Sequence, residues 1–157
     1  MPHQLPLERL TEVLFDLLDE TFENVHGIYL DKGTSLFETL ADITAEEASR
    51  ATSGRCATLA AQVNHARYYL DVLDGYMRQA LSERPDWQGS WQVGVVTAGE
   101  WARIQAELRA SYEQVMATIR GFEAWDGENE LPGALAVVVH TAHHLGEIRQ
   151  MLCAIRA

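Results

Sequence analysis

The spacing of prolines and apolar residues is the feature that most constrains this chain of 157 residues. All four prolines lie at expected element boundaries: Pro2, Pro6, Pro85 and Pro132. In the long intervals between them, apolar side chains recur every three or four positions, and no alternating run is long enough for a strand. Recurrence every three or four positions is the spacing of a helix with one buried face, whereas an alternating pattern would indicate a strand. The pattern therefore predicts an all-α chain.

Four long helices are expected from this periodicity. They run from about Leu7 to Phe22, from about Cys56 to Leu81, from Thr97 to about Arg120, and from Pro132 to about Ile155. A threonine followed three residues later by a glutamate is typical of a helix N-terminus, because each side chain accepts a hydrogen bond from a free backbone N–H of the first turn. The sequence has this capping pattern at Thr44 with Glu47 and at Thr97 with Glu100.

The connecting segments are of intermediate length. A short helical turn is expected around residues 35–40, a break at Gly54, a loop over residues 82–94, and an acidic loop over residues 123–130. The chain shows no internal repeat and no heptad run. Helices joined in this way pack most simply against one another around one core. We expect residues 1–157 to form a single domain, an antiparallel four-helix bundle.

Charge and cysteine content narrow the range of partners and compartments. The formal net charge is −11, from 23 acidic and 12 basic residues. Such a surface repels phosphate backbones and anionic lipids, so neither nucleic acid nor membrane partners are expected. Cys56 and Cys153 are too few for a disulfide framework and show no CxxC spacing. The first residues resemble no signal peptide, and the longest apolar run is residues 134–139. A soluble cytoplasmic protein is expected.

Three of the six histidines lie in one five-residue stretch of the most apolar predicted helix. His140 and His144 are four residues apart, so they differ by about 40° around the helix axis and about 6 Å along it. One metal ion can accept a nitrogen from each. The alternative is that they are solvated or are core histidines bonded to carbonyls. Val137, Ile148 and Met151 share their side of the helix and favour a buried pair.

A third ligand would have to come from another helix. His65 is the only other histidine well inside a predicted helix, on a face with Ala61, Tyr69 and Val72. His143 is the rival within the pair's own helix, although it points about 100° away from His144. His26 and His3 lie in a connector and near the terminus and are weaker candidates. The predicted metal ligands are therefore His65, His140 and His144.

At these residues the sequence resembles the DinB-like superfamily of metal-dependent helical bundles, which includes the YfiT-like proteins. Three stretches carry the resemblance, which covers nearly the whole chain: residues 35–49, residues 62–65 (QVNH) and residues 140–150 (HTAHHLGEIRQ). The resemblance implies an antiparallel bundle that holds one divalent metal ion with His65, His140 and His144. It also implies a homodimer. Some members transfer or isomerise thiol adducts with mycothiol, bacillithiol or glutathione.

Three neutral imidazoles leave coordination positions open, which suits catalysis better than a closed structural site. The ion is expected to be zinc, nickel or iron, since imidazole suits each of them. Three functions remain open: a thiol S-transferase acting on a small molecule, a hydrolase that uses metal-activated water, and a non-catalytic stress-related binding protein. Catalytic residues are not identified. The possible accessory residues are Tyr68, Tyr69, Glu147 and Arg149, with Trp87, Trp91 and Trp101 either covering the pocket or packing in the core.

Overall fold

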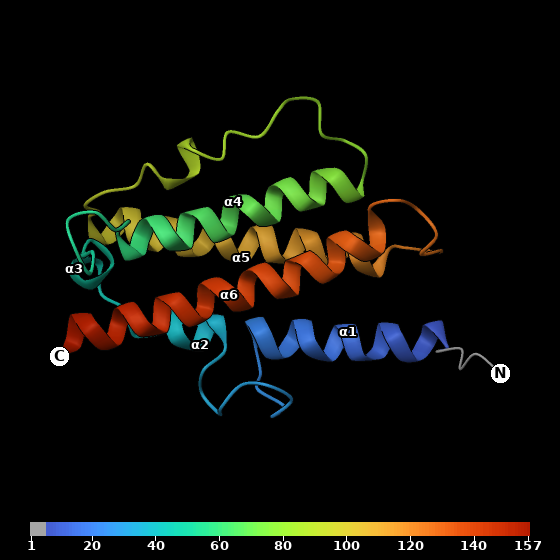
Figure 1. The fold of residues 1–157 in the computed structure, drawn as a ribbon, viewed down its shortest axis with the longest axis horizontal. Helices are drawn as coiled ribbons and strands as arrows, with labels where there is room; N and C mark the ends of the chain where they lie inside the picture. The colour runs from blue at the N-terminus through green and yellow to red at the C-terminus, as the bar shows by residue number, and fades with distance from the viewer. Residues whose placement is uncertain (1–5) are drawn as a thin grey trace. The chain divides into compact units, whose positions relative to one another are not determined.

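The computed structural model describes residues 6–157, and within that range the chain forms helices and no strand. The elements are α1 (Leu7–Phe22), α2 (Leu36–Ala41), α3 (Ala45–Ala48), α4 (Leu59–Met77), the 3-10 turn η1 (Gly89–Trp91), α5 (Ala98–Arg120) and α6 (Glu130–Arg156) (Figure 1). The all-α prediction is confirmed. Among the described residues, no helix has both the length and the apolar character needed to cross a membrane.

Local capping explains where the helices begin and end. Thr97 and Glu100 form the predicted capping box before α5, and Gly121 ends that helix. Helix α4 is shorter than the predicted 56–81, because the Thr58 side chain accepts a hydrogen bond from a backbone N–H of the first turn and so fixes the start after it. Shortly after the end of α4, Gln79 adopts a positive φ of 54°, which a continuing helix does not allow.

The chain divides into two compact units, one ending at Ala41 and the other running from Asp42 to Ala157. In the first unit, the fully buried carboxylate of Glu20 on α1 organises the connector that follows the helix. It accepts hydrogen bonds of 2.7–2.9 Å from the backbone N–H groups of His26, Ile28, Tyr29 and Leu30. The prediction that the whole chain is one domain stays a prediction.

In the second unit, α4 packs against both α5 and α6. Side-chain pairs between α4 and α5 advance together along both helices: Arg67 with Glu107, Asp71 with Ser111, and Asp74 with Thr118. The two helices therefore run parallel. Pairs between α4 and α6 run in opposite order, Gln62 with Glu147 and Tyr69 with His140, so α6 is antiparallel to α4.

The predicted antiparallel arrangement is therefore wrong for the α4–α5 pair. The physical reason lies in segment 78–97, which is long enough to lead the chain back along α4 before α5 begins (Figure 1). Two hydrogen bonds of 2.8 Å hold this segment against α4, from the Thr58 hydroxyl to the Val93 carbonyl and from the Asn64 amide to the Ser90 carbonyl. The segment therefore lies along α4, on the side that carries His65.

Candidate metal centre

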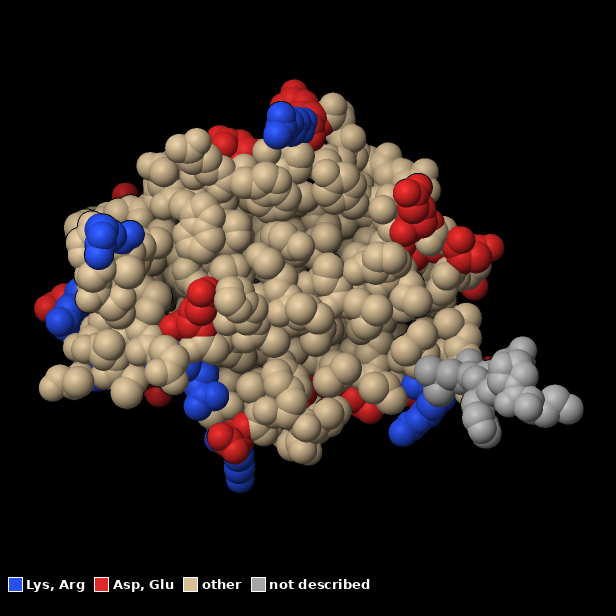
Figure 2. Space-filling view, viewed as in Figure 1, with Lys and Arg blue, Asp and Glu red and all other residues tan. Residues whose placement is uncertain are grey.

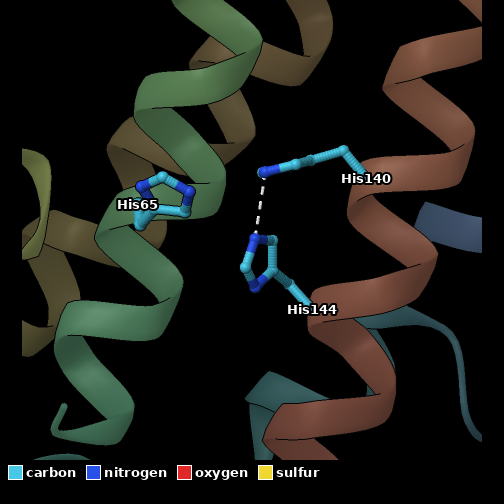
Figure 3. A group of neighbouring side chains, drawn as sticks. All are labelled: His65, His140 and His144. Atoms are coloured by element: carbon cyan, nitrogen blue, oxygen red, sulfur yellow. Dashed lines mark hydrogen bonds between the residues drawn. The ribbon is translucent and has the colours of Figure 1, made fainter. Parts of the chain in front are cut away.

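The three histidines that the sequence singled out lie together in the second unit. His65 on α4 faces His140 and His144 on α6 (Figure 3). The Nε2 atoms of His140 and His144 are 3.0 Å apart, and the His65 ring lies 5.3 and 5.0 Å from theirs, measured between ring centroids. One nitrogen of each ring lies within 4.8 Å of the others, so the group could hold a metal ion. The predicted convergence is confirmed.

The second nitrogen of His65 is fixed by a buried serine. The Nδ1 atom of His65 lies 2.7 Å from Ser90 Oγ, and the Ser90 hydroxyl donates to the Trp87 carbonyl, also at 2.7 Å. Because a hydroxyl has one hydrogen, Ser90 must accept from His65, which places the imidazole proton on Nδ1. The Nε2 lone pair of His65 is then free for the centre of the cluster.

His144 is oriented by a carboxylate in the same way. Its Nδ1 lies 2.9 Å from Oε2 of Glu147, to which Gln62 Nε2 also donates. A carboxylate accepts only, so the proton of the His144 ring sits on Nδ1 and the Nε2 lone pair faces His140. A carboxylate behind a histidine ligand is common at metal sites, where it fixes the tautomer and raises the basicity of the ligating nitrogen.

His140 is held differently. Its ring stacks on Tyr69, with centroids 3.4 Å apart and planes inclined by 7°. Its Nδ1 atom is buried and has no hydrogen-bond partner. Its Nε2 atom lies 3.0 Å from Nε2 of His144. Its position is therefore set by stacking rather than by a second hydrogen bond.

All three imidazoles are neutral near pH 7. Burial, reinforced by the nearby His144, lowers the pKa of His65 to about 4. Burial and the neighbouring histidines lower the pKa of His140 to about 3, and burial also lowers the pKa of His144. A metal competes with protons for imidazole nitrogens, so these rings offer their lone pairs without first losing a proton.

The donor set fits a divalent transition metal. Imidazole nitrogens bind zinc at about 2.0–2.1 Å, which in a tetrahedral site places them roughly 3.3 Å apart. The 3.0 Å between His140 and His144 is close to that value. Two of the three rings already have a partner for the nitrogen that would face away from the ion. Three ligands in a tetrahedral site leave one position for another molecule.

The rival arrangement around His143 is also present in space. His143, His144 and Glu147 form a second group that could hold a metal ion. His143 and Glu147 are both exposed, and His143 Nε2 lies 3.3 Å from the carboxylate. Since exposed carboxylate–histidine groups are readily solvated, we favour the inner group.

The other predicted candidates do not belong to the three-histidine group. His26 pairs with Asp19 at 2.6 Å, and His3 falls outside the described residues. Cys56 and Cys153 are both exposed, and neither belongs to the three-histidine group. Arg149 follows on α6 and is half-buried.

The aromatic residues divide into two roles. Trp91 stacks on His65 with centroids 3.9 Å apart, and Trp87 meets the same ring edge-on at 6.3 Å. Trp101 instead packs in the core, where its indole N–H donates to the Ile43 carbonyl. Tyr68 accepts a hydrogen bond from the backbone N–H of Asp86, which helps to hold segment 78–97.

The sequence did not indicate that Ser90 contacts His65, nor that Gln62 contacts His144 and Glu147. Gln62 lies three residues before His65, so helical spacing alone could have placed it on the same face. Ser90 lies in a segment with no periodicity, and only the path of that segment brings it to His65.

Comparison with known proteins adds no family to this picture. No family model matches the chain, and no curated protein or solved structure matches it.

Proposed function

We propose that this chain is a DinB-like metal-binding protein whose second unit holds one divalent metal ion with His65, His140 and His144. The observation that carries the proposal is the convergence of three neutral imidazoles from α4 and α6, two of them with the outward-facing nitrogen already protonated and bonded. The resemblance to DinB-like bundles rests on the same residues. We propose the helical bundle of that superfamily with α4 and α5 parallel to each other and α6 antiparallel to α4.

We further propose that the protein is an S-transferase that acts with a low-molecular-weight thiol. A divalent ion with an open coordination position lowers the pKa of a thiol that binds there and favours the nucleophilic thiolate form. The chain's own residues would orient the ligands: Ser90 through His65 and Glu147 through His144. One observation supports a transferase rather than a hydrolase. Glu147 lies at the Nδ1 side of His144 and not at the centre of the cluster, where a metal-bound water would need a base.

The first test is metal content. Elemental analysis of the purified and reconstituted chain should give about one ion per chain. His144→Ala should abolish binding, because it removes a nitrogen from the inner group. His143→Ala is the matched control on the same helix and should leave the affinity within about threefold. Loss of binding in the His143 variant alone would show that the outer group is the site.

The second test addresses the thiol. The cobalt-substituted protein should develop a thiolate-to-cobalt charge-transfer band when a low-molecular-weight thiol is added. A protein that binds cobalt but shows no band with any thiol would contradict the transferase proposal. Metal-dependent ester or amide hydrolysis by that protein would then support the hydrolase alternative.

We also propose a homodimer, for which the test is the mass in solution.

A further inference from the structure

A pocket of about 480 Å³ opens beside the histidine cluster, within the second unit. Its apolar lining comes from Ala57, Trp91 and Met151, and its polar lining includes Gln62, Glu147 and Gln150. The volume is in the range that holds a small organic molecule. None of the three histidines lines it, so it is a space adjoining the proposed metal site rather than the site itself.

Three lining residues connect the pocket to the cluster. Glu147 accepts the hydrogen bond from Nδ1 of His144 at 2.9 Å, and the Gln62 amide nitrogen, which donates to Glu147, lies 2.8 Å from the same ring nitrogen. Trp91 lines the pocket and also stacks on His65. The pocket is therefore one side chain away from two of the proposed ligands, and a molecule whose sulfur reached the centre would have its body within range of this space.

The charge of the lining is one-sided. Glu147 is the one ionisable carboxylate, and among the lining residues, all of which the structure describes, there is no lysine or arginine. Figure 2 shows that the middle of α4 and α6 is covered mainly by uncharged side chains on this face. A carboxylate entering the pocket would meet a like charge and no counterion.

The proposed metal does not reverse this balance. Three neutral imidazoles, a divalent ion, one thiolate and the Glu147 carboxylate sum to zero formal charge. A further anionic group on the same molecule would therefore find no residual positive charge. The Gln150 side-chain amide, in contrast, offers both a donor and an acceptor to hydroxyl and amide groups, and Gln62, whose Nε2 already donates to Glu147, adds its amide oxygen as an acceptor.

We propose that this pocket holds the body of the thiol substrate and selects uncharged thiols bearing amide or hydroxyl groups over thiols bearing carboxylates. The inference rests on the proposed thiol function. Trp91 and Met151 contact the apolar part of the molecule, and the two glutamines contact its polar groups. Coulomb repulsion between the exposed Glu147 carboxylate and a second carboxylate in the same pocket corresponds to roughly a tenfold loss of affinity for each added carboxylate.

A matched pair of probes tests the selection: N-acetylcysteine amide and N-acetylcysteine, which differ only in a carboxamide or carboxylate group. Each is titrated into the cobalt-loaded full chain, and the charge-transfer band gives the affinity, expressed per thiolate to correct for the different thiol acidities. The amide should bind at least about tenfold more tightly. Equal affinity, or tighter binding of the carboxylate, would overturn the charge selection while leaving the thiol function standing. No band with either probe would contradict the thiol function and this inference with it.

A charge placed in the pocket should change the preference. Gln150→Lys adds a cation to the lining and should cut the preference for the amide to less than about threefold. Gln114→Lys adds the same charge on an exposed position of α5 and is the control for overall charge. If both variants change the preference equally, the discrimination does not arise in the pocket and the proposal is wrong.

The position of the bound molecule can be followed separately from the sulfur. The methyl group of Met151, assigned with the Met151→Leu variant, should shift in the methyl spectrum of zinc-loaded protein when N-acetylcysteine amide is added. A charge-transfer band in the cobalt protein without any shift of this methyl signal would place the thiol body elsewhere and refute the proposal.

Discussion

Ser90→Ala should weaken metal binding although Ser90 contacts no metal. Ser90 is 5% exposed, and its oxygen is the acceptor for His65 Nδ1–H at 2.7 Å. Alanine leaves that N–H buried without an acceptor and frees the ring to adopt the other tautomer, whose Nε2 carries the proton and cannot bind a metal. The protein must then reverse the tautomer before His65 can act as a ligand.

The expected size follows from two independent comparisons. A buried N–H that loses its acceptor costs about 1–3 kcal/mol. Removing the partner of a ligating histidine typically weakens metal affinity by about 10- to 100-fold, which is about 1.4–2.8 kcal/mol. Since Trp91 still stacks on the ring and limits its rotation, we expect the lower end, about a tenfold increase in the dissociation constant for zinc.

The assay is competition for zinc against a chromophoric chelator, with the cobalt spectrum as a second readout of coordination geometry. Ser111→Ala is the matched control: Ser111 is also buried, and its hydroxyl donates to Asp71 on the α4–α5 side, away from the histidines. It should lose similar stability and keep its zinc affinity. Zinc affinity within twofold of the unmodified protein in Ser90→Ala, or an equal loss in both variants, would refute the role given to Ser90.

Three further predictions concern the fold. Burial raises the pKa of Glu20, but four backbone N–H donors outweigh it and lower the pKa from 4.5 to about 2. The stability that this carboxylate contributes is therefore present above pH 4.5 and lost as the pH falls toward 2. Glu20→Gln should lower the free energy of unfolding at pH 7 by about 3 kcal/mol. Urea denaturation should show that this difference between the variant and the unmodified protein shrinks below pH 4.5. On α6, a Cβ at Gly133 would lie 2.5 Å from Met77 Cγ, whereas a Cβ at Gly146 meets nothing within 4 Å. Gly133→Ala should therefore destabilise by about 1–3 kcal/mol, and Gly146→Ala should stabilise by up to about 1 kcal/mol; thermal melts that rank them the other way would contradict this packing. Thr97→Ala removes the capping box of α5 and should cost about 1 kcal/mol in the same melts, with no change in zinc affinity.

The helices could be predicted because local physics determines them. The capping pair at Thr97 and the glycine at 121 are short-range signals, and both act in the structure as the sequence indicated. The HxxxH spacing is equally local, since a helix brings residues four apart to one side. His65 could be added because few other positions offered a third imidazole within a helix.

The direction of α5 could not be predicted, because it depends on where segment 78–97 lies. That segment has no periodicity, and its contacts with α4 are single hydrogen bonds, such as those of Thr58 and Asn64 to its carbonyl groups, and ring contacts such as that of Trp91 with His65. Nothing at those positions distinguishes a segment that lies along a helix from one that turns back at its end. The contributions of Ser90 and of the pocket were hidden for the same reason.

The parallel α4–α5 pair has a consequence for how such a site can diverge. A tight turn after α4 would leave the outer side of His65 open to water, whereas the returning segment supplies both the serine and the indole that enclose it. Insertions or deletions in this segment could therefore retune the enclosure of one imidazole while the helices that carry all three stay intact. The connector, rather than the helical scaffold, is the element in which new specificities would arise most readily.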